Sequence, residues 1–97
     1  MLFVFTGQDR PGCLELRKAT RNAHLDYWKQ FGAALRFGGP VLDEQGIPKG
    51  SILIFEAKHR REAEDMSSAD PYATAGLFAT ASLDQFRLVF QDGEMVG

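Results

Sequence analysis

Four segments of the chain have the composition of β-strands, and the expected strands cover residues 1–6, 36–42, 51–57 and 77–90. The first segment is rich in aromatic and β-branched side chains, and the third is a near-continuous apolar run. A polar loop with two glycines and a proline, residues 43–50, separates the second segment from the third. In the last segment, which holds one or two strands, Phe86, Leu88 and Phe90 recur with the period of two that a half-buried strand shows.

Two longer segments have the pattern of helices. Residues 13–35 contain no proline, and small or apolar side chains recur there every three or four positions, which predicts one buried helix face. These positions are Cys13, Leu16, Thr20, Ala23, Tyr27, Phe31 and Ala34. Residues 58–69 predict a second, shorter helix, and Pro71 is suited to open a further helical turn through Ala75.

The predicted elements follow one another in the order β-α-β-β-α-β. This is the split βαβ arrangement of the ferredoxin-like α+β fold, in which four antiparallel strands carry both helices on one face. A chain of 97 residues suffices for one domain, and no repeat, low-complexity tract or linker divides it. We therefore expect a single domain over residues 1–97, with a frayed and flexible tail at residues 91–97.

Both faces of the predicted sheet are apolar. In the first strand Leu2 and Val4 point to one face while Phe3 and Phe5 point to the other, and residues 51–55 also leave both faces largely apolar. The helices cover one face, whereas the opposite face would be polar if it met water. An uncovered apolar sheet face would exceed the patch that a monomer usually tolerates. The sequence therefore predicts a homodimer in which a second copy covers the outer face.

The composition excludes several classes of protein. With 11 basic against 13 acidic side chains and a net charge of -2, the chain lacks the positive field that nucleic-acid binding requires. No apolar run approaches the roughly 18 residues of a membrane span, and the first residues do not resemble a secretory signal. The single cysteine, Cys13, rules out an internal disulfide and fits a reducing compartment. We expect a soluble, cytoplasmic protein with no nucleic-acid or membrane partner.

One flank of the long predicted helix gathers side chains that suit acid–base chemistry. His24 lies in the middle of the helix, with Arg21 one turn and Arg17 two turns before it. A histidine works as an acid or a base near neutral pH, and a carboxylate such as Asp70 would orient it. Each residue also has an ordinary interpretation. His24 fits a histidine at the edge of the core, and Asp70, which precedes Pro71, fits a helix stop and cap.

Other chemistries lack their sequence signals. Two histidines and scattered carboxylates show no spacing typical of a metal site, and no glycine-rich stretch has the lysine and hydroxyl residue of a phosphate-binding loop. Ser51 stands outside any Gly-x-Ser-x-Gly elbow, so it either donates a hydrogen bond into a pocket or simply opens a strand. We expect neither a metal nor a cofactor.

Motifs spread over residues 1–90 resemble those of the YciI-like (YCII-related) proteins. In order, they are Phe3-Val4-x-x-x-Gly7-x-Asp9, Arg17-x-x-x-Arg21-x-x-His24-Leu25, Gly39-Pro40, Gly50-Ser51, Asp70-Pro71-Tyr72-x-x-Ala75-Gly76 and Phe86-x-x-Val89-Phe90. The resemblance implies a dimeric α+β barrel of ferredoxin-like protomers and an active-site pocket with a His–Asp pair. By position this pair is His24 and Asp70. The substrate-binding neighbours that it implies are Arg17, Arg21, Ser51 and Tyr72.

Three functions fit these residues. The leading one is a cofactor-independent enzyme of lyase or isomerase type that acts on a small, anionic molecule. In this enzyme His24 moves a proton and Asp70 orients it, while Arg17 or Arg21 holds the anionic group. The second is a non-catalytic module that binds a small molecule in the same pocket. The third is a structural partner protein, in which the pocket is closed and His24 is hydrogen-bonded to backbone.

Overall fold

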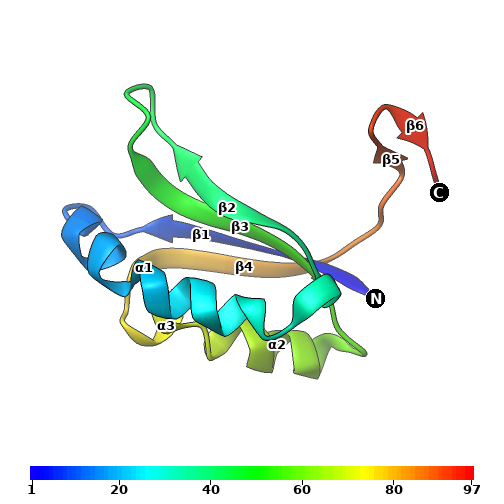
Figure 1. The fold of residues 1–97 in the computed structure, drawn as a ribbon, viewed down its shortest axis with the longest axis horizontal. Helices are drawn as coiled ribbons and strands as arrows, with labels where there is room; N and C mark the ends of the chain where they lie inside the picture. Colours follow the sequence, from blue (N-terminus) through cyan, green and yellow to red (C-terminus); the bar gives the residue numbers. More distant parts are fainter.

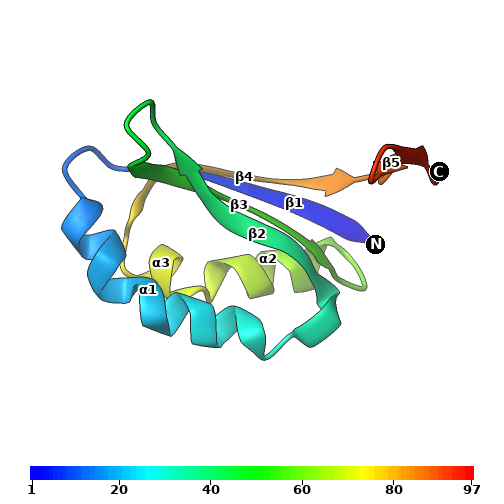
Figure 2. The same ribbon diagram turned by 45° about the horizontal axis from the view of Figure 1, so that its top comes forward.

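Ten short elements make up the protein in a computed structural model that describes residues 1–97 (Figure 1). The strands of the main sheet are β1 (Leu2–Asp9), β2 (Leu35–Leu42), β3 (Pro48–Glu56) and β4 (Phe78–Phe86). The helices are α1 (Leu14–Lys29), α2 (Arg60–Ser68) and α3 (Pro71–Thr74), with a 3₁₀ turn (Gly32–Ala34) after α1. All neighbouring strands are antiparallel, in the order β2-β3-β1-β4. Figure 2 shows the three helices on one side of this sheet, so the expected ferredoxin-like α+β fold is confirmed.

The first helix is shorter than its sequence pattern predicts. The pattern covers residues 13–35, but α1 ends at Lys29. Gly32 has a φ of +55°, a left-handed backbone conformation that glycine adopts without steric strain, and it begins the 3₁₀ turn that leads into β2. The absence of a proline therefore did not mean that one helix continued, because a glycine was enough to redirect the chain.

The hairpin between β2 and β3 is tighter than predicted. Strand β3 begins at Pro48 rather than at the start of the expected segment 51–57. Asp43 closes the turn, because its carboxylate accepts the backbone N–H groups of Gln45 and Ile47 at 2.8 and 3.0 Å. This local hydrogen bonding shortens the loop and lets the residues after it pair with β2.

The two later helices lie where the sequence places them. Helix α2 occupies Arg60–Ser68, inside the predicted 58–69, and α3 begins at Pro71 as expected. At the start of α2 the side chain of His59 accepts the backbone N–H of Glu62 at 3.2 Å, so this histidine caps a helix. None of the helices is long and apolar enough to cross a membrane.

The buried face of α1 differs from the predicted one. The apolar spacing places Thr20 and Ala23 on the inner face, but the buried side chains of α1 are Arg17, His24 and Trp28. The most buried face is therefore rotated by about one residue, or roughly 100° about the helix axis. Tyr27 and Phe31, which the spacing also places on the inner face, are partly buried and pack against the core as expected. An arginine and a histidine tolerate this position because each one meets a carboxylate, which satisfies polar groups that burial would otherwise penalise.

The apolar core lies between the sheet and the helices. Phe55 of β3 is fully buried, and its ring centroid lies 5.1 Å from that of Trp28 and 6.5 Å from that of Phe3. Ala63 and Met66 of α2 belong to the same cluster. This core fixes the C-terminal half of α1 against the sheet, and one side of the same helix borders the candidate site along its length.

The chain beyond β4 forms a small hairpin, β5 (Phe90–Gln91) with β6 (Glu94–Met95), where the sequence predicts a frayed tail. Asp92 and Gly93 have positive φ values of 53° and 80°, which an Asp-Gly hairpin turn requires. The strand alternation expected after Phe86 is wrong, because β4 ends at that residue. Figures 1 and 2 both show the hairpin beyond the end of β4, away from the helices.

Replacing Phe55 by alanine is expected to lower the free energy of unfolding by about 3–5 kcal/mol, because it empties a fully buried aromatic site. Phe90→Ala is the matched control. Phe90 is 65 % exposed on the hairpin, and its truncation should change the free energy by no more than about 0.5 kcal/mol. Urea unfolding of the two variants measures both values, and equal losses would contradict this position of the core.

Candidate functional site

A cavity of about 570 Å³ lies between α1 and the strands β2 and β3. Its α1 wall consists of side chains three or four positions apart, the spacing that brings residues to one helix face. The main residues of this wall are Arg17, Arg21, His24, Leu25 and Trp28. The facing wall comes from β2, β3 and α3 and includes Leu35, Gly38, Pro40, Ser51, Leu53 and Tyr72.

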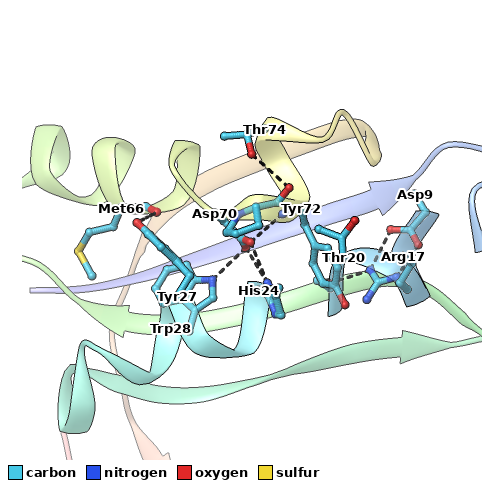
Figure 3. Close-up of polar contacts among 12 residues, drawn as sticks. Asp9, Arg17, Thr20, His24, Tyr27, Trp28, Met66, Asp70, Tyr72 and Thr74 are labelled. Carbon is cyan, nitrogen blue, oxygen red and sulfur yellow. Dashed lines mark hydrogen bonds and ion pairs between the residues drawn. The ribbon is translucent and has the colours of Figure 1, made fainter. Parts of the chain in front are cut away.

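His24 and Asp70 are in direct contact at the side of this cavity, although they are 46 residues apart in the sequence (Figure 3). The Nδ1 atom of His24 lies 2.8 and 3.0 Å from the two carboxylate oxygens of Asp70. The same carboxylate accepts the indole N–H of Trp28 at 2.9 Å and the backbone N–H of Tyr72 at 2.9 Å. Asp70 is only 1 % exposed, so its position depends on these donors from α1 and α3.

The two sequence interpretations of Asp70 are compatible with each other. Asp70 is the N-cap of α3, and Pro71 follows it at the first helical position, where a missing N–H carries no penalty. The capping bond to Tyr72 uses one oxygen and leaves the carboxylate facing α1. A helix cap therefore also brings a negative charge against His24.

The contact with Asp70 defines which nitrogen of His24 is available. An ionised carboxylate only accepts hydrogen bonds, so the proton of the neutral imidazole sits on Nδ1 and the lone pair on Nε2. Nε2 has no hydrogen-bond partner in the protein. Every fully buried side-chain nitrogen or oxygen has such a partner, so Nε2 is not fully buried and is accessible from the cavity that His24 lines. A ring held by a buried carboxylate, with its free lone pair toward a cavity, has the geometry of a general base.

Tyr72 holds the ring of His24 from one face. The two rings are stacked, with centroids 3.9 Å apart and planes at 18°. The guanidinium carbon of Arg17 lies 4.7 Å from the centre of the Tyr72 ring, within cation–π range. Burial raises the pKa of the Tyr72 hydroxyl above its ordinary value, although the positive charges of Arg17 and Arg21 act in the opposite direction.

Arg17 is engaged by protein groups. It donates two hydrogen bonds to the carboxylate of Asp9, at 2.7 and 2.9 Å, and one to the hydroxyl of Ser51 at 2.8 Å. Burial by itself lowers the pKa of Arg17, but the hydrogen bonds and the negative charge of Asp9 outweigh it and raise the pKa above its ordinary value. Arg17 therefore remains charged, and Asp9 balances that charge.

The other basic side chains of the cavity are free for a ligand. Lys18 has only a long ion pair with Glu15, 3.7 Å, between exposed side chains, and Arg21 and Lys29 have no ion pair. No aspartate or glutamate lines the cavity, although the whole chain carries a net charge of -2. The cavity therefore attracts anions more strongly than the overall charge suggests. No group of three His, Cys, Asp or Glu side chains is placed to hold a metal ion.

The structure connects five of the six residues predicted for the site through successive contacts, namely His24, Asp70, Tyr72, Arg17 and Ser51. The sixth, Arg21, lines the cavity without a hydrogen bond to another side chain. The sequence reasoning missed two residues of this network, Asp9 and Trp28. Trp28 follows His24 by four positions, a spacing that indicates one helix face. Asp9 is the last residue of the motif Phe3-Val4-x-x-x-Gly7-x-Asp9, which by itself indicates no role for the carboxylate.

The fold and the site together define a ferredoxin-like α+β protein with a His–Asp pair beside a basic cavity. Residues 1–87 match the family described as the YCII-related domain. An uncharacterized protein of Haemophilus influenzae is 33 % identical over 93 % of this chain and 100 % of its own length. Protein YciI of Escherichia coli O6:H1 is 32 % identical over the same shares. The chain therefore belongs to the YCII-related family.

Two solved structures are similar to this chain in fold. The 5-chloro-2-hydroxyhydroquinone dehydrochlorinase TftG of Burkholderia phenoliruptrix AC1100, in complex with 2,5-dihydroxybenzoquinone, is similar with a TM-score of 0.83. It is 35 % identical in sequence, and the match covers 90 % of this chain and 94 % of TftG. An antibiotic biosynthesis monooxygenase from Bacteriodes thetaiotaomicron has a TM-score of 0.59 at 10 % identity, over 99 % of this chain and 95 % of its own. This second likeness concerns the fold alone.

The chain has two tyrosines, and the pKa of each is raised, in both cases mainly by burial. As the pH rises through about 10, the tyrosines of the unfolded chain lose their protons before those of the folded chain. The folded state then binds more protons than the unfolded state, so we expect its stability to fall above this pH. Phenolate absorbance and circular dichroism, followed during a pH titration, should change together. Titration of both tyrosines near pH 10 in a protein that stays fully folded would contradict the burial.

Proposed function

We propose that this protein is a cofactor-independent enzyme of lyase or isomerase type that acts on a small, anionic molecule in the cavity. The observation that carries the proposal is the contact of His24 Nδ1 with the buried carboxylate of Asp70, which leaves Nε2 facing the cavity. In this reading His24 is the acid and base, Asp70 orients it, and Arg21 holds the anionic group of the substrate. The free and unpaired Cys13 is consistent with a protein of the cytoplasm.

The reaction that fits these groups begins with a proton next to a carbonyl group. Nε2 of His24 takes that proton, and the electron pair of the broken C–H bond forms a new π bond. In an elimination the leaving group departs with its own bonding pair, whereas in an isomerisation the imidazolium returns the proton at a different atom. Asp70 stabilises the imidazolium between the two steps, and Arg21 stabilises negative charge on the substrate.

Similarity to a solved enzyme supports this class of reaction. TftG, which is 35 % identical to this chain, is described as a dehydrochlorinase, so it removes hydrogen and chlorine from its substrate. Such an elimination needs a base and a site for a small oxygen-rich ring. The cavity of this chain offers His24 as the base, with the ring of Tyr72 stacked on it.

His24→Gln and Asp70→Asn are expected to lower kcat by about 10² to 10⁴, the usual contribution of a positioned acid–base group. The probe is 5-chloro-2-hydroxyhydroquinone, the compound named for TftG, with chloride release as the readout. Asp70→Asn should also change the pH profile, because an amide no longer fixes the proton on Nδ1.

His59→Gln is the matched control for these variants, since His59 is the other histidine of the chain and caps α2 away from the cavity. It should keep the activity of the unchanged protein. Full turnover with an unchanged pH profile in both His24→Gln and Asp70→Asn would contradict the mechanism. Binding of the probe without any chemical change would favour the non-catalytic binding module instead.

We also propose that a second copy of the chain covers the outer face of the sheet. The register places Phe37, Ile54 and Val4 in one row across β2, β3 and β1, and Phe37 is 62 % exposed. Ile52 lies beside this row and is 40 % exposed. An apolar face of this kind can pack against the same face of a second copy around a two-fold axis, the commonest symmetry of soluble oligomers.

Ile52→Lys is expected to convert the dimer into a monomer, because it places a charge in the proposed interface without touching the core. Sedimentation velocity should show the mass change from two chains to one chain of 10.8 kDa. Asn22→Lys adds the same charge on the exposed helical side and should leave the mass unchanged. A wild-type protein that sediments as one chain would contradict the dimer.

A further inference from the structure

The cavity follows α1 for most of the helix. Its α1 wall extends from Leu14 to Lys29, a distance of about 22 Å at 1.5 Å per residue. A volume of about 570 Å³ over that length describes an elongated groove, and it is more space than one small polar group needs. The shape of the cavity therefore carries information about the substrate in addition to its charge.

The two halves of this groove differ in chemistry. Around the N-terminal half of α1 lie the free cations Lys18 and Arg21, with Leu14 as the one apolar side chain of α1 there. They face Pro40 and Ser51, which pair with each other across β2 and β3. We call this part the basic half. Around the C-terminal half the lining is mainly apolar and consists of Leu25, Trp28, Leu35 and Leu53. We call this part the apolar half.

His24 lies between the two halves. Arg21 is one helical turn before it, and Trp28 is one turn after it. Trp28 is only 2 % exposed and its indole N–H is already used by Asp70, so the small part of its surface that reaches the groove is apolar. A molecule that reacts at His24 therefore has cations on one side of its reacting atom and apolar side chains on the other.

Lys29 is the one charged residue at the apolar end. It is exposed, and a lysine commonly lays its methylene stem along apolar surface while its ammonium group stays in water. Lys29 is thus compatible with an apolar occupant next to it. A ligand with a second anionic group would instead form an ion pair with Lys29. The binding of dicarboxylates separates these two cases.

We infer that the substrate has one anionic group, bound by Arg21 and Lys18, and an apolar body that fills the apolar half of the groove. This inference rests on the proposed function only for the position of the reacting atom beside His24. The substrate class is therefore a monoanion with an apolar chain or ring on the far side of its reactive carbon. Sugars and nucleotides fit the apolar half poorly, because its side chains offer no hydrogen bonds in exchange for those with water.

Two neighbouring glycines of β2 allow the apolar half to be tested directly. Gly38 pairs with Leu53, and a Cβ atom there would lie 2.6 Å from the Leu53 side chain, on the cavity side of the sheet. Gly39 pairs with the exposed Ile52, and a Cβ atom there would meet nothing within 4 Å. Gly38→Val therefore narrows the apolar half, whereas Gly39→Val adds the same side chain on the outer face, in the proposed dimer interface. Sedimentation velocity therefore checks that Gly39→Val associates like the unchanged protein before its binding is compared.

The experiment measures the binding of straight-chain carboxylates, from acetate to octanoate, and of the corresponding alcohols by isothermal titration calorimetry at fixed ionic strength. The protein carries His24→Gln, so that the result does not depend on whether the enzyme turns anything over. Affinity should rise by about fourfold for each added methylene, since ~0.8 kcal/mol per buried CH₂ corresponds to that ratio. The alcohols should bind more weakly than the carboxylates at every length.

Variants then separate the two halves. Arg21→Gln should remove most of the advantage of carboxylates over alcohols and keep the dependence on chain length, while Arg87→Gln, outside the cavity, should change neither. Gly38→Val should weaken the longest chains most, and Gly39→Val should not. Urea unfolding checks that each variant is folded.

Three results would overturn the inference. The first is an affinity that does not depend on chain length, and the second is equal binding of alcohols and carboxylates. The third is that dicarboxylates bind more tightly than monocarboxylates of the same length and that Lys29→Gln abolishes this difference. Such a result would assign a second anionic group to the apolar end. None of these results bears on proton transfer by His24, so failure here and failure of the proposed function are distinguishable.

Discussion

The carboxylate of Asp70 is the group on which the arrangement of the site depends. It is almost completely buried, and a buried negative charge is tolerated only when donors surround it. Those donors are the imidazole of His24, the indole of Trp28 and the backbone N–H of Tyr72. One carboxylate thereby fixes α1 against the start of α3 and orients the histidine that faces the cavity. Stability of the fold and geometry of the site have the same physical origin here.

The buried ion pair of Arg17 with Asp9 distinguishes Arg17 from the other cations of the cavity, which have no buried partner. Arg17 is neutralised by Asp9 and tied to Ser51, and its guanidinium group lies over the ring of Tyr72. Arg17 thereby contacts Tyr72, whose ring is stacked on that of His24. Because that charge is balanced, the field that a ligand meets comes from Arg21 and its exposed neighbours along α1. A list of basic residues in the sequence does not reveal this division.

The two faces of the sheet serve different purposes. The inner face carries the aromatic core and one wall of the groove. Gly38 has no side chain there, which leaves room for the side chain of Leu53. The outer face is apolar across three strands and has no cover within one chain. A partner on the outer face would leave the groove between α1 and β2 open to small molecules. Assembly and ligand binding are therefore compatible on one small sheet.

The sequence by itself determined the type and order of the four main strands and the three helices, because hydrophobic period and turn residues are local properties of the chain. For example, the apolar run 51–57 predicts the strand β3, and the proline at position 71 predicts the start of α3. It also identified His24 and Asp70 as candidates through their motifs. Only the tertiary structure decided which face of α1 is buried, since an arginine enters the core only where Asp9, from another element, meets it. The same holds for the contact between His24 and Asp70, because a hydrogen bond across 46 residues follows from packing and no local pattern encodes it.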